Sequence, residues 1–269
     1  MLDLLRIRLQ QGVRTSSFPR GDPEFPARFR GLPIFTPSSG GAETAECRHQ
    51  GPSSLLIELD GHPALDVGAC LFSPEESGAS AHGTIAFTSE YRMATRSRAD
   101  LVTATGELAL AQALEAQARQ LFGRSLRLRS VAAGSCGGCE AELVALGNVV
   151  FDMARFGVQF VASPRHADGI VVTGAVSRNM RDAVLRTLEA TPEPRLVIAV
   201  GACAINGGPF RGSPDVEDGV SSLVPVDLWI PGCPPHPLTT LDGLLRLLGR
   251  LEAGGRPTPA VVRHPGADP

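Results

Sequence analysis

The chain has 269 residues, of which 43% are hydrophobic, and its formal net charge is -3 at pH 7. This length allows one large core with an appended module. The slight negative charge argues against general nucleic-acid binding, because affinity for phosphates comes mainly from cationic side chains. The apolar runs are shorter than the roughly 20 residues that span a bilayer. The opening MLDLLRIRLQQG lacks the pattern of a secretory signal, so we expect none.

The first part of the chain differs in composition from the rest. We predict a separate module over residues 1–100, of which residues 13–100 are rich in Pro, Gly, Ser and Arg and contain only short apolar runs, such as SSLLIELDG and GTIAFTSEY. Residues 101–124 begin with LVTATGELALAQALEAQARQL, whose spacing and good helix formers predict a connecting helix. Residues 255–269 are rich in Pro and Gly and are predicted to form a loose tail.

Residues 125–254 have the pattern of an α/β domain. Five short apolar segments read as strands: LRLRSVAA, GVQFVAS, GIVVTGA, RLVIAVGA and VDLWIPG. Helix-like segments lie between or after them, at 140–155, 177–190 and 237–252. Short apolar strands that alternate with helices predict a mainly parallel sheet with helices on both faces.

Four of the six cysteines follow predicted strands. Cys136 and Cys139 come after the first strand, Cys203 follows RLVIAVGA, and Cys233 follows VDLWIPG. Sites in open α/β sheets form beyond the carboxyl ends of the strands, so the four thiols are predicted to meet at one edge. Glycines flank them and permit tight turns and close approach of the backbone: Gly134, Gly137, Gly138, Gly201 and Gly232.

Several kinds of chemistry are compatible with these thiols. Four thiolates with space and backbone N–H donors around them favour a 4Fe–4S cluster. Structural zinc usually uses two short paired motifs, whereas only Cys136 and Cys139 form a C-x-x-C pair here. A redox dithiol explains that pair alone, and inert buried thiols are the remaining reading. The spacing of the cysteines alone does not decide between a cluster, zinc, a redox dithiol and inert thiols.

The segments around these cysteines also resemble a known family. GSCGGCEAEL, ARFGVQFVASPRHADGIVVTGAVSRNM, AVGACAINGGPF and VPVDLWIPGCPPHP resemble, in this order, the small subunit of membrane-bound NiFe hydrogenases of the formate-hydrogenlyase type. They are similar to the B-type subunit of NADH–quinone oxidoreductase as well. The resemblance covers about residues 125–252. It implies a flavodoxin-like fold and one 4Fe–4S cluster held by Cys136, Cys139, Cys203 and Cys233.

The resemblance also implies a role and partners. We expect an electron-transfer subunit that is not catalytic alone and that places its cluster next to a catalytic large subunit. Membrane subunits would attach it to the cytoplasmic face of the membrane, and a separate ferredoxin-like protein is a possible donor. The C-x-x-C spacing favours the hydrogenase-like branch, because the quinone-oxidoreductase branch usually has adjacent cysteines. The alternatives are a quinone-reducing subunit of B type and a cluster-free assembly subunit.

Other residues in these motifs have two readings each. The SPRHAD segment contains Arg165, His166 and Asp168. These residues could have a functional role, in tuning the cluster or contacting the large subunit. We favour the structural alternative, in which they cap the following strand. Glu140 either shuttles protons or, as we favour, complements the start of a helix. His236 either donates toward the cluster or faces solvent, and we expect the latter.

The first hundred residues resemble the two-cluster ferredoxin that partners this family. The resemblance rests on RTSSFPRGDPEFPARFRGLPIF and GTIAFTSEYRMATRSRADL. Only Cys47 and Cys70 remain as thiols, so neither ferredoxin cluster is expected to form. We expect a degenerate docking module that is poorly ordered without its partners. The eight aligned ligand positions are Ser38, Gly41, Thr44, Cys47, Cys70, Ser73, Glu76 and about Ser80.

Overall fold

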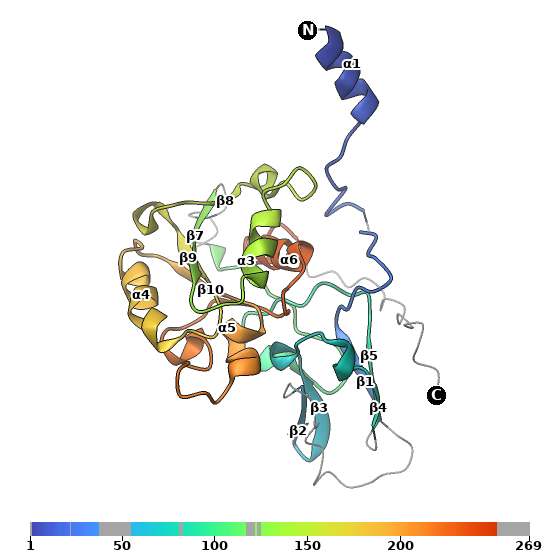
Figure 1. Cartoon of the computed structure of the whole chain (residues 1–269), viewed down its shortest axis with the longest axis vertical. Helices are drawn as coiled ribbons and strands as arrows, with labels where there is room; N and C mark the ends of the chain where they lie inside the picture. The colour runs from blue at the N-terminus through green and yellow to red at the C-terminus, as the bar shows by residue number, and fades with distance from the viewer. Residues whose placement is uncertain are drawn as a thin grey trace.

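Five parallel strands form the largest sheet of the computed structural model, which describes residues 2–21, 23–37, 55–80, 83–116, 122 and 125–251. Along the sheet the order is β11-β10-β9-β7-β8, and every neighbouring pair is parallel (Figure 1). Counted in chain order this is 2-1-3-4-5, the flavodoxin-like arrangement, and the expected fold class is confirmed. The strands are β7 (Leu126–Ala132), β8 (Val158–Phe160), β9 (Gly169–Thr173), β10 (Leu196–Val200) and β11 (Leu228–Ile230).

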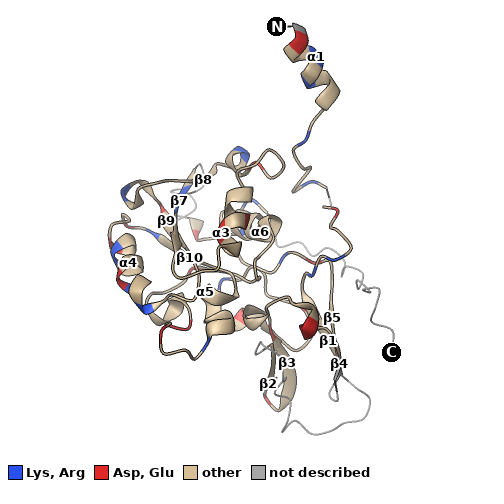
Figure 2. Ribbon diagram, in the orientation of Figure 1, with Lys and Arg blue, Asp and Glu red and all other residues tan. Residues whose placement is uncertain are grey.

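Helices cover both faces of this sheet, as expected. Leu143 of α3 and Leu241 of α6 belong to one apolar core, whereas Val184 of α4 and Ile205 of α5 belong to the other. Charges of both signs are interspersed along α4, as suits a helix with a solvent-facing side (Figure 2). The helices are α3 (Gly138–Ala145), α4 (Arg178–Glu189), α5 (Ala202–Asn206) and α6 (Pro237–Leu247).

The helix predicted over 140–155 is shorter than expected. It ends at Ala145, and a separate 3-10 turn, η4, follows at Met153–Phe156. The Asn148 side chain accepts hydrogen bonds from the backbone N–H groups of Val150 and Phe151, at 2.8 and 3.1 Å. A short polar side chain that bonds to its own backbone in this way favours a turn over a helix.

The connecting helix predicted over 101–124 is wrong for residues 101–115. After β6 (Val102–Thr103) the chain runs without a helix along the α/β domain. The N–H of Ala111 donates to the carbonyl of Ala94 at 2.7 Å, and that of Leu114 donates to the carbonyl of Leu247 at 2.9 Å. Such tertiary contacts outweigh helix propensities of a few tenths of a kcal/mol per residue. Residues 117–121 and 123–124 lie outside the described ranges.

The N-terminal module runs from β1 to the end of β6, residues 33–103, and its described part contains two small antiparallel sheets, β1-β5-β4 and β2-β3-β6. They share an apolar core that includes the fully buried Leu55, Leu65 and Phe87, so packing holds the module. Cys70 is buried in this core, whereas Cys47 lies outside the described residues. The strands are β1 (Pro33–Pro37), β2 (Leu56–Leu59), β3 (His62–Asp66), β4 (Gly78–Ser80) and β5 (Gly83–Phe87).

The module is joined closely to the α/β domain. Thr95 forms an antiparallel bridge with Trp229 of the edge strand β11, with N···O distances of 3.0 and 2.9 Å. Before the module, α1 (Leu2–Gln11) points away from the rest of the chain and exposes Leu4 and Leu9 (Figure 1). No helix in the described ranges has the length and hydropathy of a membrane span.

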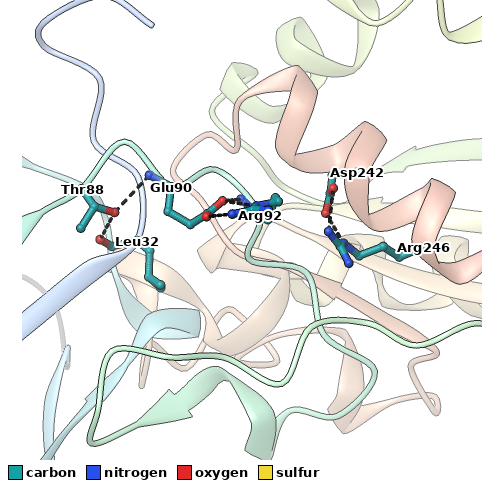
Figure 3. A network of polar contacts seen from close by, with 6 residues as sticks. All are labelled: Leu32, Thr88, Glu90, Arg92, Asp242 and Arg246. Atoms are coloured by element: carbon teal, nitrogen blue, oxygen red, sulfur yellow. Dashed lines mark hydrogen bonds and ion pairs between the residues drawn. The ribbon is translucent and has the colours of Figure 1, made fainter. Parts of the chain in front are cut away.

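A polar network lies between the module and α6 (Figure 3). On the module side, Arg92 Nε donates to Glu90 Oε1 at 2.6 Å, and the Glu90 N–H donates to the hydroxyl of Thr88 at 3.1 Å. On α6, Arg246 Nε donates to Asp242 Oδ2 at 2.7 Å, and both side chains are almost fully buried. This part of the junction is therefore polar and contains paired charges.

We expect Leu101→Ala to destabilise the chain by about 2–5 kcal/mol, the range for emptying a well-packed leucine site. Leu101 directly precedes β6 of the module but is fully buried in the core that contains Ile205 and Trp229. Urea unfolding measures the change as a lower midpoint. Leu59→Ala is the control, because Leu59 is 44% exposed. Equal midpoint shifts in the two variants would contradict our conclusion that burial of Leu101 in the core of the α/β domain helps to hold the two parts of the chain together.

Candidate functional site

Three strand ends deliver four cysteines to one edge of the sheet, as predicted. Cys136 and Cys139 follow β7, with Cys139 in the first turn of α3. Cys203 lies in α5 directly after β10, and Cys233 follows β11. The last two segments are tied together, because the N–H of Gly201 donates to the Ile230 carbonyl and that of Ala202 donates to the Gly232 carbonyl, both at 2.9 Å.

Glycines leave the room that these thiols occupy. A Cβ atom built on Gly201 would lie 2.5 Å from Cys139 Sγ, and one on Gly208 would lie 2.8 Å from Cys203 Sγ. Both distances are shorter than real Cβ contacts. Gly201 and Gly208 also have φ angles of +90° and +54°, which glycine adopts without strain. The site is therefore a cradle that any larger residue at these positions would fill.

Cys139, Cys203 and Cys233 are poor anions without a positive partner. Burial raises the pKa of Cys139 well above its usual range, and the nearby Cys203 raises it further. Burial, and then the proximity of Cys233, raises the pKa of Cys203 to about 11. Burial and the neighbouring Cys136 raise the pKa of Cys233. A raised pKa keeps a thiol protonated at neutral pH, so binding of a metal centre at this edge would release protons.

In the described parts of the chain, no three His, Cys, Asp or Glu side chains come close enough together to hold one metal ion. The four cysteines nevertheless influence one another electrostatically across the edge. The ligands of a multi-iron cluster can lie farther apart than those of zinc, because each thiolate binds a different iron, whereas zinc draws its sulfur ligands to about 2.3 Å from one point.

Glu140 fastens the start of α3 to the neighbouring strand. Its Oε1 accepts hydrogen bonds from the hydroxyls of Ser135, at 2.6 Å, and Thr173. Burial alone would raise the pKa of Glu140, but these two hydrogen bonds lower it below its usual value. The contacts agree with the structural role that we favoured from the sequence.

The SPRHAD loop lies at the other end of the strands from the cysteines. Asp168 and Arg127 exchange hydrogen bonds where β9 and β7 begin: the Arg127 N–H donates to Asp168 Oδ2 at 2.7 Å, and the Asp168 N–H donates to the Arg127 carbonyl at 2.6 Å. Arg165 and His166 line a shallow cavity of about 310 Å³ there. The loop thus caps strands, and we assign it no part in the cysteine site.

His236 is enclosed, and the expectation that it faces solvent is wrong. Its ring stands edge-on to Phe25, Phe29 and Phe151, with centroid distances of 5.1, 5.6 and 5.7 Å. Its Nδ1 accepts the N–H of Leu238 at 3.2 Å and so caps α6. Burial lowers the pKa of His236 to about 4. The N-terminal phenylalanines that enclose it have no periodic pattern that would mark them in the sequence.

Comparison with known proteins gives a consistent match for this part of the chain. Residues 136–247 match the family model described as NADH ubiquinone oxidoreductase, 20 Kd subunit. Formate hydrogenlyase subunit 7 of Escherichia coli is 46% identical over 129 residues, which cover 48% of this chain and 51% of that protein. This chain therefore matches about half the length of that relative.

Two further relatives are covered more fully. The probable membrane-bound hydrogenase subunit mbhJ of Pyrococcus furiosus is 42% identical over 136 residues, covering 51% of this chain and 81% of that protein. The B-type subunit of NADH-quinone oxidoreductase from Heliobacterium modesticaldum is 46% identical over 127 residues, covering 47% of this chain and 71% of that protein. The matched part includes all four cysteines of the sheet edge.

Proposed function

Because this chain belongs to the family of the NADH ubiquinone oxidoreductase 20 Kd subunit, we propose that it is the electron-transfer subunit of a membrane-associated oxidoreductase complex. Cys136, Cys139, Cys203 and Cys233 would hold one 4Fe–4S cluster. Such a cluster, when bound, accepts and donates one electron at a time. The proposal rests above all on the four thiols that three strand ends bring to a cradle of glycines.

The chain's own residues supply binding and enclosure. Gly201 and Gly208 leave the space beside Cys139 and Cys203. Cys139, Cys203 and Cys233 are partly buried, which shields these three thiols in part from water. Cys136 is the exposed thiol of the four, so we place the catalytic large subunit over this side. The chain would pass electrons, and bond making would belong to that partner.

The N-terminal module has a different role in this proposal. Cys70 is buried in an apolar core, which supports our view that the second ferredoxin position no longer holds a cluster. A module without clusters cannot relay electrons, so another subunit would donate to the remaining centre directly. The joint through Thr95 and Leu101 makes the module part of the scaffold of the complex. Attachment to the membrane would run through partner subunits.

Two branches of the family fit the chain about equally by identity, since the formate hydrogenlyase relative and the NADH-quinone oxidoreductase relative are both 46% identical to it. The C-x-x-C spacing of Cys136 and Cys139 favours the hydrogenase-like branch. A large subunit that lacks nickel-binding cysteines would favour the quinone-reducing branch instead.

We expect the anaerobically purified chain to contain about four irons with matching sulfide and to give a cubane EPR signal on reduction. Iron and sulfide analysis with EPR of the reduced protein measures this directly. Zinc in place of iron, or no metal, would overturn the proposal in favour of an assembly role. Roughly twelve irons per chain would show that the N-terminal module still carries clusters.

A further inference from the structure

A loop of the N-terminal module borders the cysteine edge. The 3-10 turn η1 (Val67–Ala69) packs against α5, the helix that carries Cys203. The contact is tight, because a Cβ built on Gly68 would lie 2.9 Å from Ile205 Cγ2. Cys70 follows η1 directly, and a second turn, η2 (Pro74–Glu76), closes the loop.

The centre of this loop is a buried carboxylate, that of Glu76, which is 1% exposed. Its Oε1 accepts the N–H of Leu71 at 2.9 Å. Its Oε2 accepts the N–H of Ser73 at 2.9 Å and lies 3.5 Å from the thiol of Cys70, which donates to it. A carboxyl group that only accepts hydrogen bonds has the pattern of the ionised form.

The negative charge of Glu76 has no positive partner within the described ranges. The ion pairs found there join other residues, and Arg30, the nearby cation of this loop, donates to the Phe72 carbonyl. The groups that hydrogen-bond to the Glu76 carboxylate are two backbone N–H groups and a thiol, all of them neutral. In a buried setting with a low effective dielectric constant, such a charge acts over longer distances than a surface charge does.

The fold places Glu76 near the cysteine edge. The carboxylate of Glu76 bonds to the thiol of Cys70, and Cys70 directly follows η1. Because η1 packs against α5, the helix that carries Cys203, the loop that holds Glu76 lies beside the proposed ligands.

We propose that Glu76 lowers the reduction potential of the centre held by the four cysteines, by fixing a buried negative charge beside it. Added negative charge near a cluster makes acceptance of an electron less favourable, and net charge is one of the factors that set cluster potentials. Glu76 acts through its field and is a positioning residue. The inference rests on the proposed function, because it requires a redox centre at this edge.

The test compares Glu76→Gln with Glu75→Gln in the full chain. Both variants remove one negative charge from η2, but Glu75 is exposed and solvent screens it. Redox titration followed by EPR gives the midpoint potential, and iron analysis gives cluster content. We expect Glu76→Gln to raise the potential by more than the titration error, and Glu75→Gln to leave it unchanged.

The outcomes separate the two proposals. Wild-type protein without iron overturns the proposed function. Intact clusters with the same potential in wild type and Glu76→Gln overturn this inference alone, as does an equal shift in Glu75→Gln. If Glu76→Gln does not retain its cluster, the variant Cys70→Ala tests the inference instead, because it removes a hydrogen-bond donor that offsets the charge of Glu76. We then expect the midpoint potential of Cys70→Ala to be lower than that of the wild type. An unchanged or higher midpoint potential would overturn the inference.

Discussion

We expect that replacing Gly201 with alanine removes the proposed iron centre from the chain although all four cysteines remain. The new methyl group would lie 2.5 Å from Cys139 Sγ and 3.4 Å from the Gly232 carbonyl oxygen. The backbone at Gly201 has φ and ψ of 90° and 155°, a region almost confined to glycine, and the strain costs on the order of 1–3 kcal/mol. We expect iron content to fall from about four to below about one per chain.

Two controls make this result specific to the site. Gly61 also has a positive φ, +77°, but a Cβ there meets nothing within 4 Å. Gly61→Ala should therefore retain its iron and lose on the order of 1 kcal/mol of stability. Cys203→Ala gives the iron level expected after loss of a ligand. Full iron content in Gly201→Ala would contradict the role of Gly201 in the cradle.

The positions of the strands and of the cysteines could be predicted from the sequence, for a physical reason. A parallel strand covered on both faces must be apolar on both, and every residue of β9 and β10 is buried. Such runs are visible in the sequence, and so are the cysteines and glycines that follow them. The order of the strands is a long-range property, and we expected it from the resemblance to a family.

Short and irregular elements were not predictable in this way. The helix α5 carries Cys203 but has only five residues, between Gly201 and Gly207, which is too short for a periodic pattern. The segment 101–115 has helical spacing but is held without a helix by hydrogen bonds to distant residues. In both places, contacts with the rest of the fold decide the local structure.

The ferredoxin resemblance predicts which ligands the N-terminal module lacks, but not what stands in their place. Glu76 occupies a position where that pattern has a cysteine, and its carboxylate now accepts the hydrogen bonds of the surrounding loop. A buried glutamate cannot be told from an exposed one by sequence, as its neighbour Glu75 shows. Glu76 lies in the loop between β3 and β4, and the first turn of this loop, η1, packs against α5.

Asp242→Ala should destabilise the chain by about 3–5 kcal/mol, because it takes the buried carboxylate partner away from Arg246. The two side chains are 2% and 6% exposed, and Arg246 Nε lies 2.7 Å from Asp242 Oδ2 (Figure 3). Urea unfolding at constant ionic strength gives the change in the midpoint. Arg181→Ala is the control, since Arg181 is 53% exposed and 3.8 Å from Glu217; we expect less than about 0.5 kcal/mol there.

The same pair should add little net stability over apolar residues of similar size. Burial raises the pKa of Asp242 although hydrogen bonds from Arg246 lower it, so ionisation of Asp242 opposes folding. With the folded pKa above the unfolded one, protonation favours the folded state, and that contribution is lost as pH rises through the folded pKa. The double variant Asp242→Leu/Arg246→Met should therefore be as stable as wild type within about 1 kcal/mol, or more stable. A double variant as unstable as Asp242→Ala would show instead that the charges themselves hold α6 against the N-terminal module.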